Sequence, residues 1–302
     1  MKYKFGYVSI IGKPNAGKST LINSLIGEKV AIVSNKPQTT RNNILGIYNG
    51  KKDNLQYQIV FIDTPGIHQS KNNLDKYMMK NVRSAIGGCD LLVYLIDGTK
   101  KLDEEELNYI KNLTDKGLNV IVCVTKIDVL KYESTLPFLM KIAENKKIKE
   151  IVPISSLQHK NVNLLIDEVL KQFPETTEKH FEFEEDDYTD KSLRFLCAEI
   201  IREKALLNLN QEIPHGIGIE IVSFKEENNL TTIEADIVCE RDSHKGIILG
   251  SRGSMIKKIG AQARQDIENL CGTKVMLILF VKTKKDWRNN TNVINNLGYN
   301  EQ

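Results

Sequence analysis

The chain has 302 residues, 41% of them hydrophobic, and its 42 basic and 39 acidic residues give a net charge of +3. This length suits about two domains and is enough to bury a sizeable core. The near-balance of charge excludes a globally basic nucleic-acid binder, so a nucleic-acid site would have to show in the local distribution of charge.

The cysteines and apolar runs limit the compartment. The five cysteines are scattered and form no CxxC pair, which favours reduced, mostly buried thiols in a cytoplasm over disulfides or zinc. The apolar run Val275 to Val281 is far shorter than the ~20 residues of a membrane span. Since the first motif follows the N-terminus almost at once, we expect no signal peptide.

Residues 12–19 read GKPNAGKS, a full GxxxxGKS phosphate-binding loop. It lies between the apolar run Phe5 to Ile11 and a helix-like stretch, Ser19 to Ile26, so a chance glycine-rich turn is a poor explanation. We expect Lys18 to reach the β- and γ-phosphates and the Ser19 hydroxyl to ligate Mg²⁺, while backbone N–H groups turn toward the phosphates. The predicted nucleotide contacts in this stretch are Gly12, Asn15, Ala16, Gly17, Lys18, Ser19 and Thr20.

An acidic residue ends the next apolar run. Asp63 follows the strand-like stretch Tyr57 to Ile62 and opens the sequence DTPG. At that position it can hold Mg²⁺ through a water molecule, as the second acidic site of P-loop NTPases does. The Gly66 N–H can meet a γ-phosphate and so sense whether it is present. DTPG alone is ordinary turn chemistry, and its place after a phosphate loop is what indicates a function.

Two further motifs concern the base. Thr125, Lys126 and Asp128 follow the strand-like run Val120 to Val124, in an arrangement that resembles the base-reading NKxD of GTPases. The Asp128 carboxylate would accept from N1–H and the 2-amino group of guanine, which adenine lacks, so it predicts GTP over ATP. Thr125 stands where Asn is usual, and the loss of the amide can weaken loop tethering. Order along the chain places a loop that would meet guanine O6 at Ser155, Ser156 and Leu157.

Thr40 is our candidate for the residue that closes over Mg²⁺ and the γ-phosphate in the GTP state, with Thr39 as runner-up. The predicted catalytic residues are therefore Lys18, Thr40 and Gly66. Ras-like proteins place Gln directly after the DxxG glycine to orient the attacking water, whereas Ile67 can neither donate nor accept a hydrogen bond. We therefore expect slow intrinsic hydrolysis. His68 is either a base or a solvated loop residue, and the sequence leaves both open.

Strand-like and helix-like stretches alternate as far as Phe173, which predicts a doubly wound α/β domain with a mostly parallel sheet. Each motif then falls at the C-terminal end of a strand, where open α/β sheets bind ligands. A small-molecule P-loop kinase would not need TKID at a strand end. Acidic residues become dense after Pro174, as in a solvated linker. We predict a P-loop GTPase domain over residues 1–176, an acidic linker over 177–190 and a second domain over 191–302.

The second domain has a helix, two alternating strands, two helices joined by the sequence GSRG, and a last strand. This order and the I-I-L-G-x-x-G-x-x-I-K-K-I-G pattern predict an α+β type II KH domain, whose GXXG loop clamps about four nucleotides. For a bare GxxG, a glycine-capped helix–helix turn is the alternative. The predicted RNA contacts are Lys245, Gly250, Ser251, Arg252, Gly253, Lys257 and Lys258. A second basic group contains Lys274, Lys282, Lys284, Lys285 and Arg288.

Together these motifs give the chain a resemblance to the bacterial Era GTPases. It is carried by GKPNAGKSTLIN, KPQTTRNNILGI, FIDTPGIH, YTDKSLRFLCAEIIREKALL, EIPHGIGIEI and HKGIILGSRGSMIKKIG. The resemblance implies a cytoplasmic GTPase that uses GTP/GDP and Mg²⁺, binds the 3′ end of small-subunit rRNA in a GTP-dependent way and assists 30S subunit assembly. Some members associate with the periphery of the inner membrane. GTPases with a similar loop can use an Asn at the position of Asn15 to seat K⁺ between the phosphates.

The alternative function is a constitutive RNA-binding protein with a vestigial nucleotide site, against which the intact Lys18, Ser19, Asp63 and Asp128 argue. We expect GTP to order the Thr40 and Gly66 loops and to act on the KH domain through the acidic linker. No heptad pattern suggests self-association, so we expect a monomer.

Overall fold

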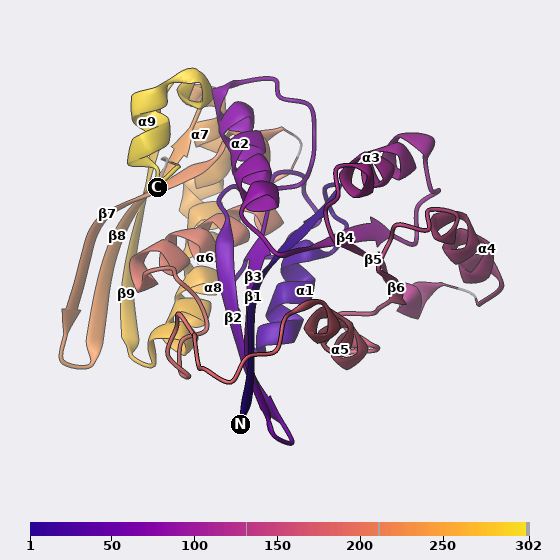
Figure 1. Cartoon of the computed structure of the whole chain (residues 1–302). Coiled ribbons are helices and arrows are strands. Elements are labelled where there is room, and N and C mark those ends of the chain that lie inside the picture. Colours follow the sequence, from indigo (N-terminus) through magenta and orange to yellow (C-terminus); the bar gives the residue numbers. More distant parts are fainter. Residues whose placement is uncertain (131, 211, 300–302) are drawn as a thin grey trace. The chain divides into compact units, whose positions relative to one another are not determined.

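The computed structural model describes residues 1–130, 132–210 and 212–299. These residues form two compact units, each described here by itself. Unit 1 comprises Met1–Ala31, Asn42–His68 and Met79–Asp190, and unit 2 comprises Ile32–Arg41, Gln69–Met78 and the chain from Lys191 onward. Figure 1 shows the elements of both units and their labels.

Unit 1 is built around one sheet in the order β2-β3-β1-β4-β5-β6. Its strands are β1 (Lys2–Gly12), β2 (Ile44–Lys52), β3 (Leu55–Asp63), β4 (Leu91–Asp97), β5 (Val120–Thr125) and β6 (Glu150–Pro153). The β2–β3 pair is antiparallel and the other pairs are parallel. β2 and β3 run antiparallel because the two-residue hairpin turn Asp53-Asn54 joins them. Asp53 takes a φ of +51°, as tight hairpin turns require.

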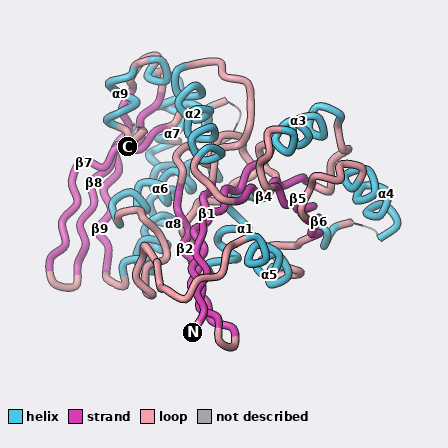
Figure 2. The backbone as a smooth tube through the Cα atoms, in the orientation of Figure 1, coloured by secondary structure: helices cyan, strands magenta, loops and turns pink. Residues whose placement is uncertain are grey.

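Helices alternate with these strands, as the tube in Figure 2 shows. They are α1 (Lys18–Ile26), α2 (Asn73–Gly87), α3 (Glu104–Asp115), α4 (Tyr132–Ala143) and α5 (Val162–Gln172). The first part of α2, as far as Met78, is assigned to unit 2. The prediction of a doubly wound P-loop domain followed by a KH domain is confirmed, because crossover helices on a mostly parallel sheet define that architecture and the chain continues into a KH topology.

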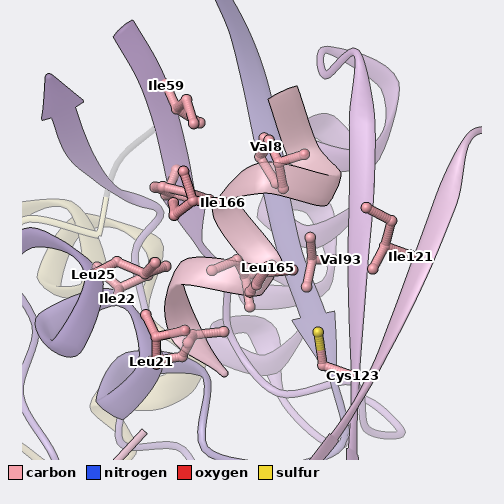
Figure 3. Close-up of a cluster of buried hydrophobic side chains, with 14 of the residues drawn as sticks. Val8, Leu21, Ile22, Leu25, Ile59, Val93, Ile121, Cys123, Leu165 and Ile166 are labelled. Carbon is pink, nitrogen blue, oxygen red and sulfur yellow. The ribbon is translucent and has the colours of Figure 1, made fainter. Parts of the chain in front are cut away.

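Each face of the sheet in unit 1 carries its own buried cluster. On one face, Leu21 and Ile22 of α1 and Leu165 of α5 pack against strand residues that include Val8 and Val93, as Figure 3 shows. The second cluster joins residues of β4 and β5 to α3 and α4. Burial on both faces explains why β4 and β5 are continuous apolar runs rather than alternating ones.

In unit 2, helices pack against a sheet in the order β7-β8-β9. Its elements are α6 (Leu193–Asn208), β7 (Gly218–Glu227), β8 (Leu230–Cys239), α7 (Asp242–Leu249), α8 (Ser254–Cys271), β9 (Lys274–Thr283) and α9 (Thr291–Asn296). The last strand pairs in parallel with β8, so the α-β-β-α-α-β order predicted for a type II KH domain is present. Helix α9 lies beyond that predicted order.

The acidic segment 177–190 is hydrogen-bonded to the sheet of unit 1. The Gln58 side chain accepts from the N–H groups of Glu182 and Phe183 at 3.0 and 3.1 Å, and the Ile47 N–H donates to the Tyr188 carbonyl at 3.1 Å. Two acidic side chains also contact the sheet, since Glu182 accepts from the Tyr7 hydroxyl and Asp190 Oδ1 from the Leu45 N–H, but the acidic residues stay largely exposed. The segment therefore combines a solvated charged surface with a fixed backbone.

Two further observations bear on the predicted compartment. All five cysteines are free, and three of them are buried. No helix within residues 1–130, 132–210 and 212–299 has both the length and the apolar character needed to cross a membrane.

Candidate nucleotide site and nucleic-acid interface

The phosphate loop joins β1 to α1, and its two glycines hold conformations that other residues rarely adopt. Gly12 has a φ of +151°, and a Cβ there would lie 2.5 Å from the Leu95 carbonyl oxygen. Gly17 has a φ of +97° and no side chain to cap the helix that follows. The first N–H groups of α1 therefore face an anion site, which the positive end of the helix dipole also favours.

Lys18 is buried at the start of α1. Its Nζ donates to the carbonyl oxygens of Gly12 and Lys13, at 3.2 and 3.0 Å. Burial lowers the pKa of Lys18 to about 8, against the opposing influence of the Asp63 carboxylate. The loop thus holds a cation that lacks a full counter-charge, and a phosphate would supply it.

Asp63 and Ser19 lie together at the end of β3. The Ser19 Oγ donates to Asp63 Oδ2 at 2.7 Å, and the Asp63 side chain is buried. A hydroxyl and a carboxylate are the hard oxygen ligands that Mg²⁺ prefers, so this pair fits the predicted metal site. Both are held in place by the elements that carry them, β3 and α1.

The loop after Asp63 approaches the phosphate loop so closely that only glycine fits at position 66. A Cβ on Gly66 would lie 2.9 Å from the Pro14 Cα. The Ile67 N–H donates to the Gly12 carbonyl at 3.1 Å, which fixes this contact. The structure therefore brings Gly66 to the phosphate loop, as its predicted role as a γ-phosphate sensor requires. His68 Nδ1 lies 2.7 Å from the Gly66 carbonyl, so Nδ1 carries the proton in this contact.

Thr125 ties the base-reading segment to the phosphate loop. Its Oγ1 lies 2.9 Å from the Ala16 carbonyl oxygen and 3.1 Å from that of Ile96, and the side chain is buried. The hydroxyl therefore provides a tether at the position where we expected the absence of an Asn amide to weaken the loop.

Lys126 is fixed from two sides. Its Nζ donates to the Asn15 carbonyl at 2.9 Å and to Asp97 Oδ2 at 2.7 Å. Burial alone would raise the pKa of Asp97, but hydrogen bonds from Lys126 and Thr99 outweigh it and hold the pKa below its ordinary value. Our sequence reasoning missed Asp97. The available signal was an acidic residue at the C-terminal end of β4, in the same position that Asp63 takes on β3.

The remaining base-reading residues lie on neighbouring loops of unit 1. Asp128 is half-buried in the short helix η1 (Ile127–Val129), and the Ile127 N–H donates to the Ile154 carbonyl at 3.3 Å. This bond joins η1 to the start of the loop that contains Ser155, Ser156 and Leu157. The two segments predicted to read guanine are thus brought together. Their roles, like those of the phosphate-loop residues, stay predictions.

Thr40 belongs to unit 2, within the segment Ile32–Arg41. Both it and Thr39 are buried, although the sequence reads as a polar loop. The Thr39 hydroxyl donates to the Lys36 carbonyl at 2.6 Å. The role of Thr40 at the γ-phosphate, with Thr39 as runner-up, stays a prediction.

The GXXG loop of unit 2 contains two glycines with different constraints. Gly250 ends α7 with a φ of +70°, and a Cβ there would lie 2.8 Å from the backbone nitrogen of Met255. Gly253 precedes α8 with a φ of +77°, yet a Cβ there would approach no atom closer than 4.0 Å. Gly250 is therefore required by packing as well as by conformation, whereas Gly253 leaves open space in front of α8.

The two basic groups named from the sequence, of which only the first was predicted to contact RNA, differ in their partners. Lys245, Arg252, Lys257 and Lys258 are exposed around the loop, and none forms an ion pair within the described part of unit 2. In the second group, Lys282, Lys284 and Arg288 pair with Asp236, Glu220 and Glu240. The ion pairs compensate the charge of these three residues, which makes them weaker phosphate contacts than the sequence suggested.

A phosphate loop followed by DTPG and TKID on a doubly wound sheet, together with a type II KH topology, defines a P-loop GTPase with an attached RNA-binding domain. Family models agree: one described as "50S ribosome-binding GTPase" matches residues 7–126, and one described as "KH domain" matches residues 212–288. The chain is 46% identical to GTPase Era of Clostridioides difficile, over 99% of this chain and 100% of that protein. It is 44% identical to GTPase Era of Ruminiclostridium cellulolyticum, over 99% and 98%.

The chain belongs to the Era family of GTPases. Its structure is also similar to a crystal structure of Era in complex with MgGDPNP and nucleotides 1506–1542 of 16S ribosomal RNA, with a TM-score of 0.92 and 37% identity over 99% of this chain and 100% of that one. An Aquifex aeolicus Era variant bound to GDP and AlF₄⁻ gives the same TM-score, identity and coverage.

Proposed function

We propose that this chain is a GTP-dependent RNA-binding protein that hydrolyses GTP, binds the 3′ end of small-subunit rRNA and assists assembly of the 30S subunit. The observation that carries the proposal is the coexistence of two built sites in one chain. One is the Lys18, Ser19 and Asp63 cluster at the phosphate loop. The other is the open GXXG loop with its exposed cations. The complex of a related Era with MgGDPNP and 16S rRNA nucleotides supports both halves.

Nucleotide binding would use the first N–H groups of α1 and the Lys18 ammonium for the phosphates. Ser19 and, through water, Asp63 would hold Mg²⁺, which when bound neutralises phosphate charge. In hydrolysis, water attacks the γ-phosphorus and the bond from that phosphorus to the β–γ bridging oxygen breaks, giving GDP and phosphate. Lys18, Gly66 N–H and Thr40 would stabilise the charge on the transferring group. Asp128 would accept from guanine and select GTP.

Turnover without a partner is expected to be slow, because Ile67 cannot orient a water molecule. A K⁺ ion held with the help of Asn15 is the proposed source of additional positive charge. Asn15 adopts a φ of +65°, and its carbonyl is fixed by Lys126. Equal turnover in K⁺ and Na⁺ buffers would remove this element of the proposal.

RNA binding would begin at the GXXG loop, where a nucleic-acid backbone can approach Gly253 and the start of α8. The four exposed cations around it would contact phosphates. Because their charge is not locally compensated, RNA affinity should fall steeply as salt concentration rises. A role on rRNA would place the protein in the cytoplasm and on the 30S subunit. An additional peripheral membrane association rests on family resemblance alone.

The proposal is tested by nucleotide selection. The wild-type chain should bind GTP far more tightly than ATP, and Asp128→Asn should lose that preference while Lys18 and Ser19 keep phosphate binding. If Asp128→Asn retains the guanine preference, the assignment of the base site is wrong. A chain that binds 16S 3′-end RNA with equal affinity whether or not it holds nucleotide would instead be the constitutive RNA-binding protein.

A further inference from the structure

The segment that contains Thr40 is built into the unit of the KH domain. Residues Ile32–Arg41 belong to unit 2 together with the chain from Lys191 onward. The Val33 N–H donates to Glu203 Oε1 on α6 at 2.9 Å. The Arg202 guanidinium, also on α6, donates to the Thr39 carbonyl. A segment with the composition of a solvated loop is therefore held by charged, buried groups of the KH-containing unit.

Arg41 attaches the segment through several contacts at once. Its side chain is buried, with 1% exposure, and Nη1 donates to the Ile217 carbonyl at 2.7 Å and to the Tyr299 hydroxyl at 3.1 Å. Nη2 donates to the His215 carbonyl at 3.2 Å. The guanidinium carbon lies 5.7 Å from the ring centroid of Trp287 and 5.5 Å from that of Tyr299. The two rings stack with their centroids 6.3 Å apart, so the cation lies beside a pair of stacked aromatic rings.

Burying an arginine is unfavourable unless its donors and charge are compensated. Removal of Arg41 from this cage would leave the carbonyl oxygens of Ile217 and His215 without these donors, and it would expose a face of Trp287. A second arrangement of the segment Ile32–Arg41 would therefore differ from this one in the contacts of Arg41 with Ile217, His215 and Trp287. A contact of this kind can transmit a conformational change, because packed contacts switch between discrete arrangements rather than deform gradually.

The segment that follows the DTPG motif is attached in the same unit. Asp75, which is buried, accepts from Gln38 Nε2 at 2.8 Å and from the Lys71 N–H at 2.8 Å. Asn73 Nδ2 donates to the Asn289 carbonyl at 2.9 Å, two residues beyond Trp287. Gln38, two residues before Thr40, is thus bonded to the segment that follows the DTPG motif, and Asn73 of that segment is bonded to the C-terminal part of unit 2.

We propose that Arg41 is the positioning residue through which the nucleotide state reaches the KH domain, and that its guanidinium shifts against Trp287 when Thr40 closes over the γ-phosphate. This inference rests on the proposed function. Thr40 and Arg41 are consecutive, and consecutive Cα atoms are about 3.8 Å apart, so Thr40 cannot move by several ångström without displacing the Arg41 backbone. The acidic segment is a poorer carrier of the signal, since its backbone is bonded to Gln58 and Ile47 of unit 1.

Trp287 is the single tryptophan of the chain, so its fluorescence reports directly on the cage. The experiment uses the full chain with GDP or with a non-hydrolysable GTP analogue and Mg²⁺. Tryptophan fluorescence and affinity for a 16S 3′-end oligonucleotide are measured in each state. We expect wild type to show a nucleotide-dependent fluorescence change and an RNA-affinity ratio between the states of about 5–150, the usual range of coupling.

Arg41→Met should abolish the fluorescence change and bring the affinity ratio close to one, with nucleotide affinity retained. Arg83→Met, which removes an exposed arginine from α2, is the matched control and should behave as wild type. Tyr299→Phe removes only the hydroxyl acceptor and should reduce the ratio partially. If Arg41→Met does not fold, Tyr299→Phe becomes the test. An RNA-affinity ratio in Tyr299→Phe equal to that of the wild type would then overturn the proposal.

The outcomes separate this inference from the function beneath it. A wild-type ratio of one overturns both the proposed switch and the inference. Coupling that is present in wild type and unchanged in Arg41→Met overturns the inference alone. A wild-type fluorescence signal that does not respond to nucleotide also overturns it, since the guanidinium would not have moved against Trp287.

Discussion

The depressed pKa of Lys18 predicts that nucleotide affinity depends on pH. In the free protein, burial lowers this pKa to about 8. Bound phosphates favour the ammonium form, so the nucleotide complex holds the proton to higher pH than the free protein does. Binding above about pH 8 must therefore take up a proton. Affinity should be nearly constant below about pH 7 and fall as pH rises through 8.

The magnitude follows from the pKa. At about pH 9, roughly a tenth of the free protein would carry a charged Lys18, so affinity should be about tenfold weaker than at pH 7, or about 1.4 kcal/mol. The stability of the free protein has the opposite trend. Because the unfolded chain binds this proton up to about pH 10.4 and the folded site does not, the free energy of unfolding should rise with pH between 8 and that value.

Isothermal titration calorimetry in two buffers of different ionisation enthalpy measures the nucleotide affinity and the number of protons taken up on binding. At pH 8 we expect GDP binding to take up about half a proton, since half of the Lys18 side chains would be neutral. Lys18→Arg, which stays charged throughout, should take up none and serves as the control for ionisation of guanine itself. An unchanged affinity between pH 7 and 9, with no proton uptake at pH 8, would refute the reasoning from burial.

Three further predictions concern single residues. In a filter-binding assay, Gly253→Asn should retain most RNA affinity, because Asn tolerates a positive φ and the space is open. Gly253→Asp should lose at least tenfold in RNA affinity, because it adds charge beside the RNA backbone, and equal losses in the two variants would contradict a phosphate contact there. Thr125→Val should lower the free energy of unfolding, measured by urea titration, by about 1–3 kcal/mol and should weaken GDP binding. Thr125→Ser keeps the hydroxyl and should keep both the stability and the GDP affinity. Ser19→Ala should weaken the Mg²⁺ dependence of GTP binding and leave Mg²⁺-independent GDP binding nearly unchanged, as measured by titration with and without EDTA.

The nucleotide site could be proposed from the sequence because its motifs are local. Residues 12–19 and 63–66 each occupy a single loop after a strand, and the parallel sheet places those loops at one edge. The KH topology was likewise visible in the helix–GSRG–helix pattern. Asp97 was harder to identify, because its partner Lys126 lies on a different strand end.

The surroundings of Thr40 could not be predicted for a physical reason. Residues 32–41 are polar and lack a periodic apolar pattern, so only tertiary contacts explain the burial of Arg41 beside Trp287 and Tyr299. The acidic segment was misleading in another way. Its exposed carboxylates fit a solvated linker, while its backbone makes hydrogen bonds that composition does not report.

The central claim is that nucleotide and RNA binding are linked within one chain. It is tested most directly by closing a thermodynamic cycle: RNA affinity with GTP analogue and with GDP, and affinity for each nucleotide with and without 16S 3′-end RNA. We predict that the GTP analogue tightens RNA binding relative to GDP, and that RNA tightens binding of the analogue by the same factor. RNA affinity that is identical in the two nucleotide states would contradict the account.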